Sequence, residues 1–297
     1  MTVEEFRSDR QSPALLGETE GEGTDVFLCH GLSATRKYVT HGSRSLPRAG
    51  YRVHTYDARG HGASDPAPEG EGYGYEYLVQ DLDRLVTERA ISGEVVVGGH
   101  SMGCHTAAAW ALAHPDRVAA LILIGPVFGG RLDRPGEDRW DARAEALVRG
   151  GPEAFAAEIA SGFDDPEIAK TVERLALDRA RLHRNPAAVA EALREVPRSA
   201  PFLSLDELRS IDVPTLVVGS HDEADPAHPL STARDWADTI PDSRFVVEEE
   251  GDPPLSWQGG RLSRVIAEFL DSSLEPLRDR SEGSDAEAVV RSKGREQ

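Results

Sequence analysis

The five residues 99–103, Gly-His-Ser-Met-Gly, join a short apolar run to an alanine-rich segment with no spacer between them. The run from Glu94 to Gly99 is typical of a buried strand, and the segment from Met102 to His114 is typical of a helix. A strand that passes straight into a helix needs a turn so tight that a β-carbon at either flanking glycine would collide with neighbouring backbone. Ser101 would then project above the edge of a sheet, beside the positive end of the helix.

Two other interpretations compete for this segment. An ordinary glycine-rich turn has a similar composition and would give Ser101 no chemical role. A dinucleotide-binding turn needs glycine at the position that His100 occupies. The direct succession of strand, turn and helix favours a serine nucleophile over both interpretations.

Apolar, β-branched runs alternate with amphipathic segments along most of the chain. Further buried strands are expected at 25–29, 51–57, 118–125, 214–220 and 244–249. Near-continuous apolar strands indicate a sheet that helices cover on both faces. The alternation of strand and helix therefore predicts an α/β fold with a doubly wound, mostly parallel sheet.

A mostly helical stretch interrupts this alternation. It contains apolar residues at helical spacing, such as Ile168, Val172 and Leu175. Such an insertion between two strands predicts a cap over the carboxyl edge of the sheet, where α/β sheets bind ligands. The expected domains are a core at 1–126 and 206–271, a helical cap at 127–205, and a charged, disordered tail at 272–297. Near the start of the core, a short strand is expected within 1–6 and a turn at 17–23.

Charge and cysteine content narrow the classes of partner. The chain has 33 basic and 52 acidic residues, a formal net charge of −19, which repels nucleic-acid phosphates and anionic lipid headgroups. A small-molecule acyl substrate is expected instead. Cys29 and Cys104 form no CxxC pattern, so we expect buried core thiols in a reducing cytoplasm and no structural zinc. The amino-terminal residues lack the pattern of a signal peptide, and no apolar run reaches the ~20 residues that span a bilayer.

A turn at the end of the run 25–29 faces the same edge of the sheet as Ser101. It contains His30 and Gly31, and its flexibility lets the amide of Leu32 point toward the serine. The amides of Leu32 and of Met102, the residue after the nucleophile, would together form an oxyanion hole. For His30 alone, a plain strand-ending turn is the competing interpretation.

A motif at residues 57–64, Asp-Ala-Arg-Gly-His-Gly-Ala-Ser, carries a more specific resemblance. Together with the His-Gly pair at 30–31 and the turn at 99–103, it resembles the α/β-hydrolase superfamily, in the branch of small capped esterases. The resemblance extends over about residues 20–270. It implies that Asp57 and Arg59 tie loops together near the site and take no chemical step.

The resemblance also implies a catalytic acid after a later strand. Asp222, which ends the run beginning at Pro214, has that place. Asp225, three residues further on, is a competitor. Either carboxylate could instead cap the helix that starts near Ser231.

The histidine that the resemblance implies belongs in the loop after the last strand, but residues 250–258 contain none. Asp252 or Glu250 would be a poor substitute, because a carboxyl pKa lies near ~4 against ~6.5 for imidazole. His228, the last histidine in the chain, is the expected base in a displaced position, unless it merely packs a loop. His105, one helical turn after Ser101, is a weaker candidate that we expect to pack in the core.

These residues predict a serine hydrolase that acts on a small carboxylic ester, thioester or related acyl compound through an acyl-enzyme. Ser101 would attack, and His228, oriented by Asp222 or Asp225, would move the proton. One alternative is an enzyme of the same fold that runs a lyase, isomerase or cyclase reaction. Another is a ligand-binding protein that has lost catalysis. No metal or cofactor is expected.

Overall fold

The structure is a computed structural model of the chain and describes residues 2–8, 13–90, 93–132, 137–223 and 225–274. Within these residues, eight strands form one sheet in the order β1-β2-β4-β3-β5-β6-β7-β8. They are β1 Val3–Arg7, β2 Leu16–Glu20, β3 Thr24–Cys29, β4 Tyr51–Tyr56, β5 Val95–His100, β6 Val118–Ile124, β7 Thr215–Val218 and β8 Ser243–Val246. The pairs β1–β2 and β2–β4 are antiparallel and the others are parallel. The prediction of an α/β fold with a mostly parallel sheet is confirmed.

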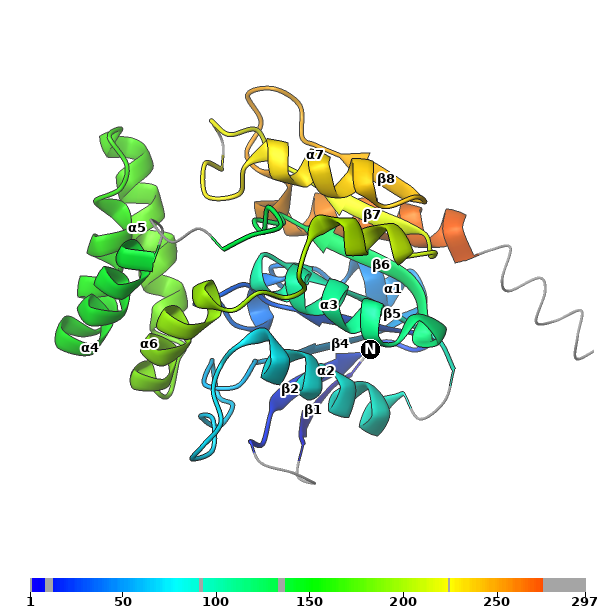
Figure 1. Cartoon of the computed structure of the whole chain (residues 1–297), viewed down its shortest axis with the longest axis horizontal. Helices are drawn as coiled ribbons and strands as arrows, with labels where there is room; N and C mark the ends of the chain where they lie inside the picture. The colour runs from blue at the N-terminus through cyan, green and yellow to red at the C-terminus, as the bar shows by residue number, and fades with distance from the viewer. Residues whose placement is uncertain (1, 9–12, 91–92, 133–136, 224, 275–297) are drawn as a thin grey trace, which may run out of the picture.

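Helices cover both faces of this sheet (Figure 1). They are α1 Ser45–Arg48, α2 Tyr75–Arg89, α3 Met102–Ala113, α4 Glu137–Ala160, α5 Pro166–Ala180, α6 Pro186–Glu195, α7 Leu230–Thr239 and a final helix over 259–274. Short 3-10 helices include η1 Arg36–Tyr38 and η6 Leu255–Trp257. Among the helices of the described residues, none has the length and apolar character needed to cross a membrane.

Successive residues of the central strands face opposite layers. In β3, Phe27 and Cys29 pack with α2 and α3, whereas Val26 and Leu28 pack with α1 and the final helix. The same alternation holds in β5, β6 and β7. Because side chains along a strand alternate with a period of two, a strand that is apolar at every position needs cover on both faces. The continuous apolar runs of the sequence therefore become the centre of the sheet.

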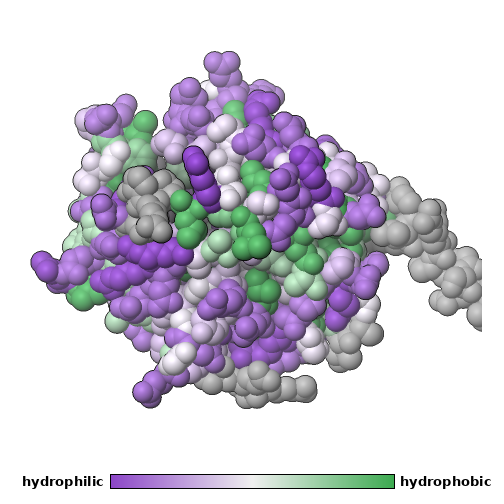
Figure 2. All heavy atoms as spheres, viewed as in Figure 1, coloured by the Kyte–Doolittle hydropathy of each residue, from purple (hydrophilic) through white to green (hydrophobic). Residues whose placement is uncertain are grey.

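The segment between β6 and β7 forms the predicted helical insertion, which stands beside the core in Figure 1. Phe155, Leu147 and Leu193 belong to its own apolar cluster, and Ala192 of α6 packs in a second cluster with Met102 of the core. Figure 2 shows a mostly hydrophilic face, with hydrophobic residues gathered in its middle. The domain limits at 127, 205 and 271 stay predictions. Of the predicted tail, residues 275–297 lie outside the described residues.

The amino-terminal strands correct one expectation. The segment 17–23 was expected to be a turn, but β2 occupies its first part and the turn is confined to residues 21–23. Gly17 lies inside the strand because the Phe6 ring packs over it: a β-carbon there would stand 2.2 Å from Phe6 Cζ. The glycine therefore marks a close packing contact and not a bend.

Two buried histidines hold the loops beneath the insertion. His183, which follows α5, accepts a hydrogen bond from the Gly62 amide at Nδ1 (2.9 Å) and donates from Nε2 to the Ser33 carbonyl (3.1 Å). His30 accepts from the Ala58 amide at Nε2 (2.9 Å). Each bond uses the lone pair of a neutral ring nitrogen, so protonation of either imidazole would break it.

We predict that His183 makes the fold less stable at acid pH. Burial lowers the pKa of His183 from 6.5 to about 4, so the unfolded chain binds this proton more readily than the folded chain. The stability that the neutral ring contributes is complete above pH 6.5, and about 3 kcal/mol of it is lost as the pH falls to about 4.

Urea unfolding of the wild type and of His183→Gln between about pH 7.5 and 4.5 measures this effect. Glutamine keeps a donor and an acceptor but does not titrate. The difference in free energy of unfolding between the two proteins should shrink as the pH falls. A difference that stays constant would contradict the prediction.

Candidate functional site

The turn from β5 into α3 places Ser101 in a strained backbone conformation. Its φ is 53° and its ψ is −114°, in a region that residues other than glycine rarely adopt. A β-carbon at Gly99 would lie 2.5 Å from the Cys29 carbonyl oxygen, and one at Gly103 would lie 2.2 Å from it. The Ser101 amide donates to the Ile124 carbonyl (2.9 Å), which fixes the turn to β6. Both glycines are therefore needed for the geometry that the sequence predicts.

The turn after β3 lies against Ser101. A β-carbon at Gly31 would stand 3.5 Å from Ser101 Cβ and 3.0 Å from His100 Nδ1. In the described part of the chain, the amides of Leu32 and Met102 have no hydrogen-bond acceptor. The structure thus brings the predicted donors to one edge of the sheet and leaves both amides unused.

His228 lies in the loop after β7, where it forms a pair with Asp225. Its Nδ1 is 2.9 Å from Asp225 Oδ2, and the two side chains are 15% and 6% exposed. The His228 amide also donates to the Asp225 carbonyl (3.1 Å), so one tight turn holds both groups. A β-carbon at Gly125, next to the end of β6, would stand 3.2 Å from His228 Cδ2. The imidazole therefore reaches the sheet edge from the direction of β6.

Asp222 takes a different place. Its Oδ1 accepts a hydrogen bond from the Leu230 amide (2.8 Å) at the start of α7. This is the capping role that the sequence left open for either carboxylate. The structure pairs His228 with Asp225, the competing carboxylate, rather than with Asp222. The reason is the short turn from Asp225 to His228, which directs both side chains inward.

His100 is a neighbour of this pair that the sequence did not single out as a site residue. Its ring centroid lies 4.7 Å from that of His228, and its buried Nε2 has no hydrogen-bond partner. Burial and the charge of His228 lower the pKa of His100 well below its ordinary value. Its position one residue before Ser101 was the available signal, but a motif does not show which way the ring points.

One group of described residues has the composition and spacing of a metal site. His100, Asp225 and His228 offer ligand atoms that all lie within 4.8 Å of one another. Two imidazoles and a carboxylate suit zinc or a similar divalent ion. The same atoms form the Asp225–His228 pair, so a bound ion would compete with proton transfer by His228.

His105 packs in the core, as expected. Its Nδ1 lies 2.7 Å from the Tyr75 hydroxyl, and its Nε2 accepts from the amides of Val127 (3.0 Å) and Phe128 (3.3 Å). Burial lowers its pKa to about 3, so the ring is neutral. His105 therefore joins α3 to the chain that leaves β6 and is not available as a base.

Asp57 and Arg59 lie where the resemblance implies, as ties between loops. The Asp57 carboxylate accepts from the Arg36 amide (2.9 Å) and from Arg36 Nη1 (2.5 Å). Arg59 binds both oxygens of Asp81 in α2, at 2.7 and 2.9 Å. Neither side chain is free to take part in a chemical step.

The loop after β8 packs against the core without a histidine. Glu248 is buried and accepts from the amides of His221 (2.7 Å) and Leu255 (3.0 Å), which fixes the loop to the end of β7. Asp252, a weak candidate base in the sequence, pairs at the surface with Arg261 (2.6 Å). This loop therefore supplies no group that matches His228 as a base.

The two cysteines are free and buried, as expected. Burial raises the pKa of Cys29 to about 12 and that of Cys104 well above its ordinary value. Since the thiolate is the reactive form, neither side chain is a nucleophile.

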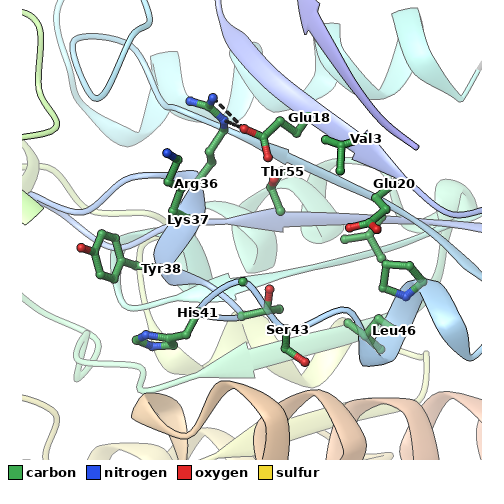
Figure 3. Close-up of a pocket in the computed structure, with 14 residues that line it drawn as sticks. Val3, Glu18, Glu20, Arg36, Lys37, Tyr38, His41, Ser43, Leu46 and Thr55 are labelled. Atoms are coloured by element: carbon green, nitrogen blue, oxygen red, sulfur yellow. Dashed lines mark hydrogen bonds and ion pairs between the residues drawn. The ribbon is translucent and has the colours of Figure 1, made fainter. Parts of the chain in front are cut away.

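A groove of about 460 Å³ lies between η1, α1, β2 and β4 (Figure 3). Tyr38 and His41 lie together at one end of it, and Val3 and Glu20 lie at the other. The groove contains neither the strained serine nor the Asp225–His228 pair. It is therefore not the site that the motifs indicate.

Comparisons with known proteins agree with this fold. A sequence profile described as alpha/beta hydrolase fold matches residues 26–259. The chain belongs to the α/β-hydrolase fold family. It is 31% identical over 264 residues to a protein from Synechocystis sp. named as a non-heme chloroperoxidase, covering 85% of this chain and 93% of that protein.

Two further relatives of this α/β hydrolase carry different names. A Bacillus subtilis protein named as a 2-succinyl-6-hydroxy-2,4-cyclohexadiene-1-carboxylate synthase is 26% identical over 284 residues, covering 91% of this chain and 99% of that protein. The structure of a thermophilic esterase from Thermogutta terrifontis, with malate bound, is 27% identical, with a TM-score of 0.73 and coverage of 91% and 99%. The family is shared by proteins named for different reactions, so it does not identify the substrate.

We predict that Gly103→Ala destabilises the fold strongly, because its β-carbon would stand 2.2 Å from the Cys29 carbonyl oxygen. Overpacking against backbone costs at least about 2 kcal/mol in free energy of unfolding. Gly129→Ala is the matched control, since a β-carbon there meets nothing within 4 Å. Urea unfolding of the two variants should show a loss for Gly103→Ala alone. Equal stability of both would mean that the turn has more room than the structure shows.

Proposed function

We propose that this α/β hydrolase is a serine hydrolase of a small carboxylic ester, thioester or related acyl compound. The observation that carries the proposal is the Asp225–His228 pair at 2.9 Å, whose imidazole lies beside His100, the residue before Ser101. A strained serine, two unused amides and a carboxylate-bound imidazole at one edge of a sheet are the parts that acyl transfer needs.

In this mechanism, the Ser101 hydroxyl attacks the substrate carbonyl carbon while Nε2 of His228 takes its proton. Asp225 holds Nδ1 and stabilises the imidazolium that forms, and thereby takes the role that the sequence first gave to Asp222. The amides of Leu32 and Met102 stabilise the negative oxygen of the tetrahedral intermediate. His228 then protonates the leaving alcohol or thiol, and water releases the acid from Ser101 by the same steps.

We predict that a fluorophosphonate probe labels Ser101 and that Ser101→Ala is not labelled. In assays with p-nitrophenyl esters, Ser101→Ala and His228→Ala should each lower kcat by about 10³-fold or more, because the two groups act as one unit. His105→Asn, outside the proposed machinery, tests whether the loss is specific to His228. Turnover that is unchanged in His228→Ala would rule out this base.

We predict that Asp225→Asn lowers kcat/KM by about 10²-fold or more, because the amide no longer stabilises the imidazolium. Asp222→Asn is the matched control, since its carboxylate caps α7 through Leu230. That variant should lose stability, by about 1 kcal/mol, and not activity. Thermal unfolding separates the two effects. The opposite pattern would return the acid's role to Asp222.

A reaction other than hydrolysis is the second candidate. The observation in its favour is the Bacillus subtilis relative, which is named as a synthase and matches 91% of this chain. In such a site the amides of Leu32 and Met102 would polarise a carbonyl without an acyl-enzyme. This candidate predicts that Ser101→Ala retains most of the activity on the true substrate. Loss of activity on treatment with a chelator would instead assign His100, Asp225 and His228 to a metal.

A further inference from the structure

Arg179, in the last turn of α5, has no ion-pair partner in the part of the chain that the structure describes. Its side chain makes no salt bridge and no hydrogen bond among the described residues, and its buried Nε has no partner. Its guanidinium carbon stands 5.1 Å from the centre of the Tyr38 ring. The side chain is partly buried. The guanidinium is therefore a partly buried cation that stacks on a ring and has no ion-pair partner among the described residues.

The end of α5 lies against the turn that carries the proposed oxyanion donor. His183, four residues after Arg179, binds the Ser33 carbonyl (3.1 Å), and Ser33 follows Leu32 directly. Tyr38, under the guanidinium, lies 5.8 Å from His41 between ring centroids. These contacts place the end of α5 against the turn that follows Leu32 and place Arg179 against Tyr38 of η1.

Electrostatics agree with this placement. Burial has the largest effect on His41 and His100 and lowers both pKa values. The charge of Arg179 lowers both pKa values further. Burial lowers the pKa of Arg179 itself, and the charges of Tyr38 and Asp225 act in the opposite direction. Since such influence falls off with distance, Arg179 shares a neighbourhood with the proposed catalytic pair.

The buried, unpartnered Nε sets Arg179 apart from the other described arginines of the insertion. Some arginines of the insertion have carboxylate partners, such as Arg181 with Glu153 (2.8 Å) and Arg194 with Glu191 (2.8 Å). The chain has 52 acidic residues, yet none forms an ion pair with Arg179 among the described residues, although the charge of Asp225 acts on it. A partly buried guanidinium without a partner costs free energy unless a ligand supplies the missing charge.

We infer that Arg179 binds a carboxylate of the substrate, so that the substrate is an acyl compound with a second, free carboxylate group. This inference rests on the proposed function. A guanidinium can present two parallel N–H donors, a geometry that matches the two oxygens of a carboxylate. The ester carbonyl then lies at Ser101 and the free carboxylate under the insertion.

The competing role for Arg179 is to balance the charge of Asp225. Asp225 already accepts a hydrogen bond from His228, and no ion pair joins it to Arg179 among the described residues. In that role, loss of the arginine would affect every ester alike. If Arg179 binds the substrate carboxylate, loss of the arginine affects only esters that carry the free carboxylate.

The test compares two esters with the same leaving group, p-nitrophenyl butyrate and mono-p-nitrophenyl glutarate. The wild type should prefer the glutarate ester in kcat/KM. In Arg179→Gln the ratio of kcat/KM for the glutarate ester to that for the butyrate ester should fall by about 100-fold, as expected when one partner of a buried charge pair is removed. Arg179→Lys should restore part of the ratio, because lysine keeps the positive charge but lacks the two parallel N–H donors of arginine.

Arg143→Gln is the matched control. Arg143 also stacks on an aromatic ring of the insertion, 4.7 Å from the centre of Trp140, and also has no salt bridge among the described residues. It lies near Glu158 and Arg139 instead of near the histidines. This variant should leave the ratio unchanged. An unchanged ratio in Arg179→Gln, with both esters slowed equally, would overturn the inference.

A binding experiment keeps this result separate from the proposed hydrolysis. In the Ser101→Ala background, calorimetric titration with glutarate should give a Kd at least about 10-fold weaker when Arg179→Gln is added. The neutral analogue glutaramide should show no such dependence on Arg179. If neither ester is hydrolysed but this shift appears, the proposed function fails and the carboxylate site stands. Equal binding of glutarate with and without Arg179 would overturn the inference.

Discussion

The close approach of α3 to β3 is the constraint on which the site depends. The Cys29 carbonyl oxygen lies where β-carbons at Gly99 and Gly103 would stand, so neither position accepts a side chain. Because the backbones can touch there, the chain leaves β5 and enters α3 through the single residue Ser101, with φ at 53°. Such strain costs on the order of 1–3 kcal/mol and persists only where surrounding structure enforces it. Here the buried helix α3 and the bond to Ile124 enforce it.

Surroundings, and not residue type, decide which imidazoles can move a proton. His30, His105 and His183 are buried and each accepts a backbone amide, so they stay neutral and hold loops in place. His228 differs in both respects, because its side chain is 15% exposed and its Nδ1 faces the carboxylate of Asp225. A carboxylate at that position stabilises the protonated ring, which is what the proposed base requires.

The charge of Arg179 is opposite in sign to the net charge of the chain. A formal charge of −19 disfavours the approach of anions in general. Arg179 supplies a local exception, stacked on Tyr38 and without an ion-pair partner among the described residues. An anionic substrate would therefore be held by a single well-placed group, while the surface around it discourages other anions.

The sequence by itself determined the sheet and the position of Ser101, because apolar periodicity and the need for glycine at 99 and 103 are local properties. It also located the helical insertion. It did not decide between Asp222 and Asp225, since both lie in one short loop and only the folded turn shows which carboxylate meets His228 and which caps α7. Arg179 continues the spacing of Ile168, Val172 and Leu175 along α5, but a lone charge on a helical stripe does not reveal what it faces. Contacts between segments far apart in the chain are set by the packing of the insertion on the core, and that packing exists only in the tertiary structure.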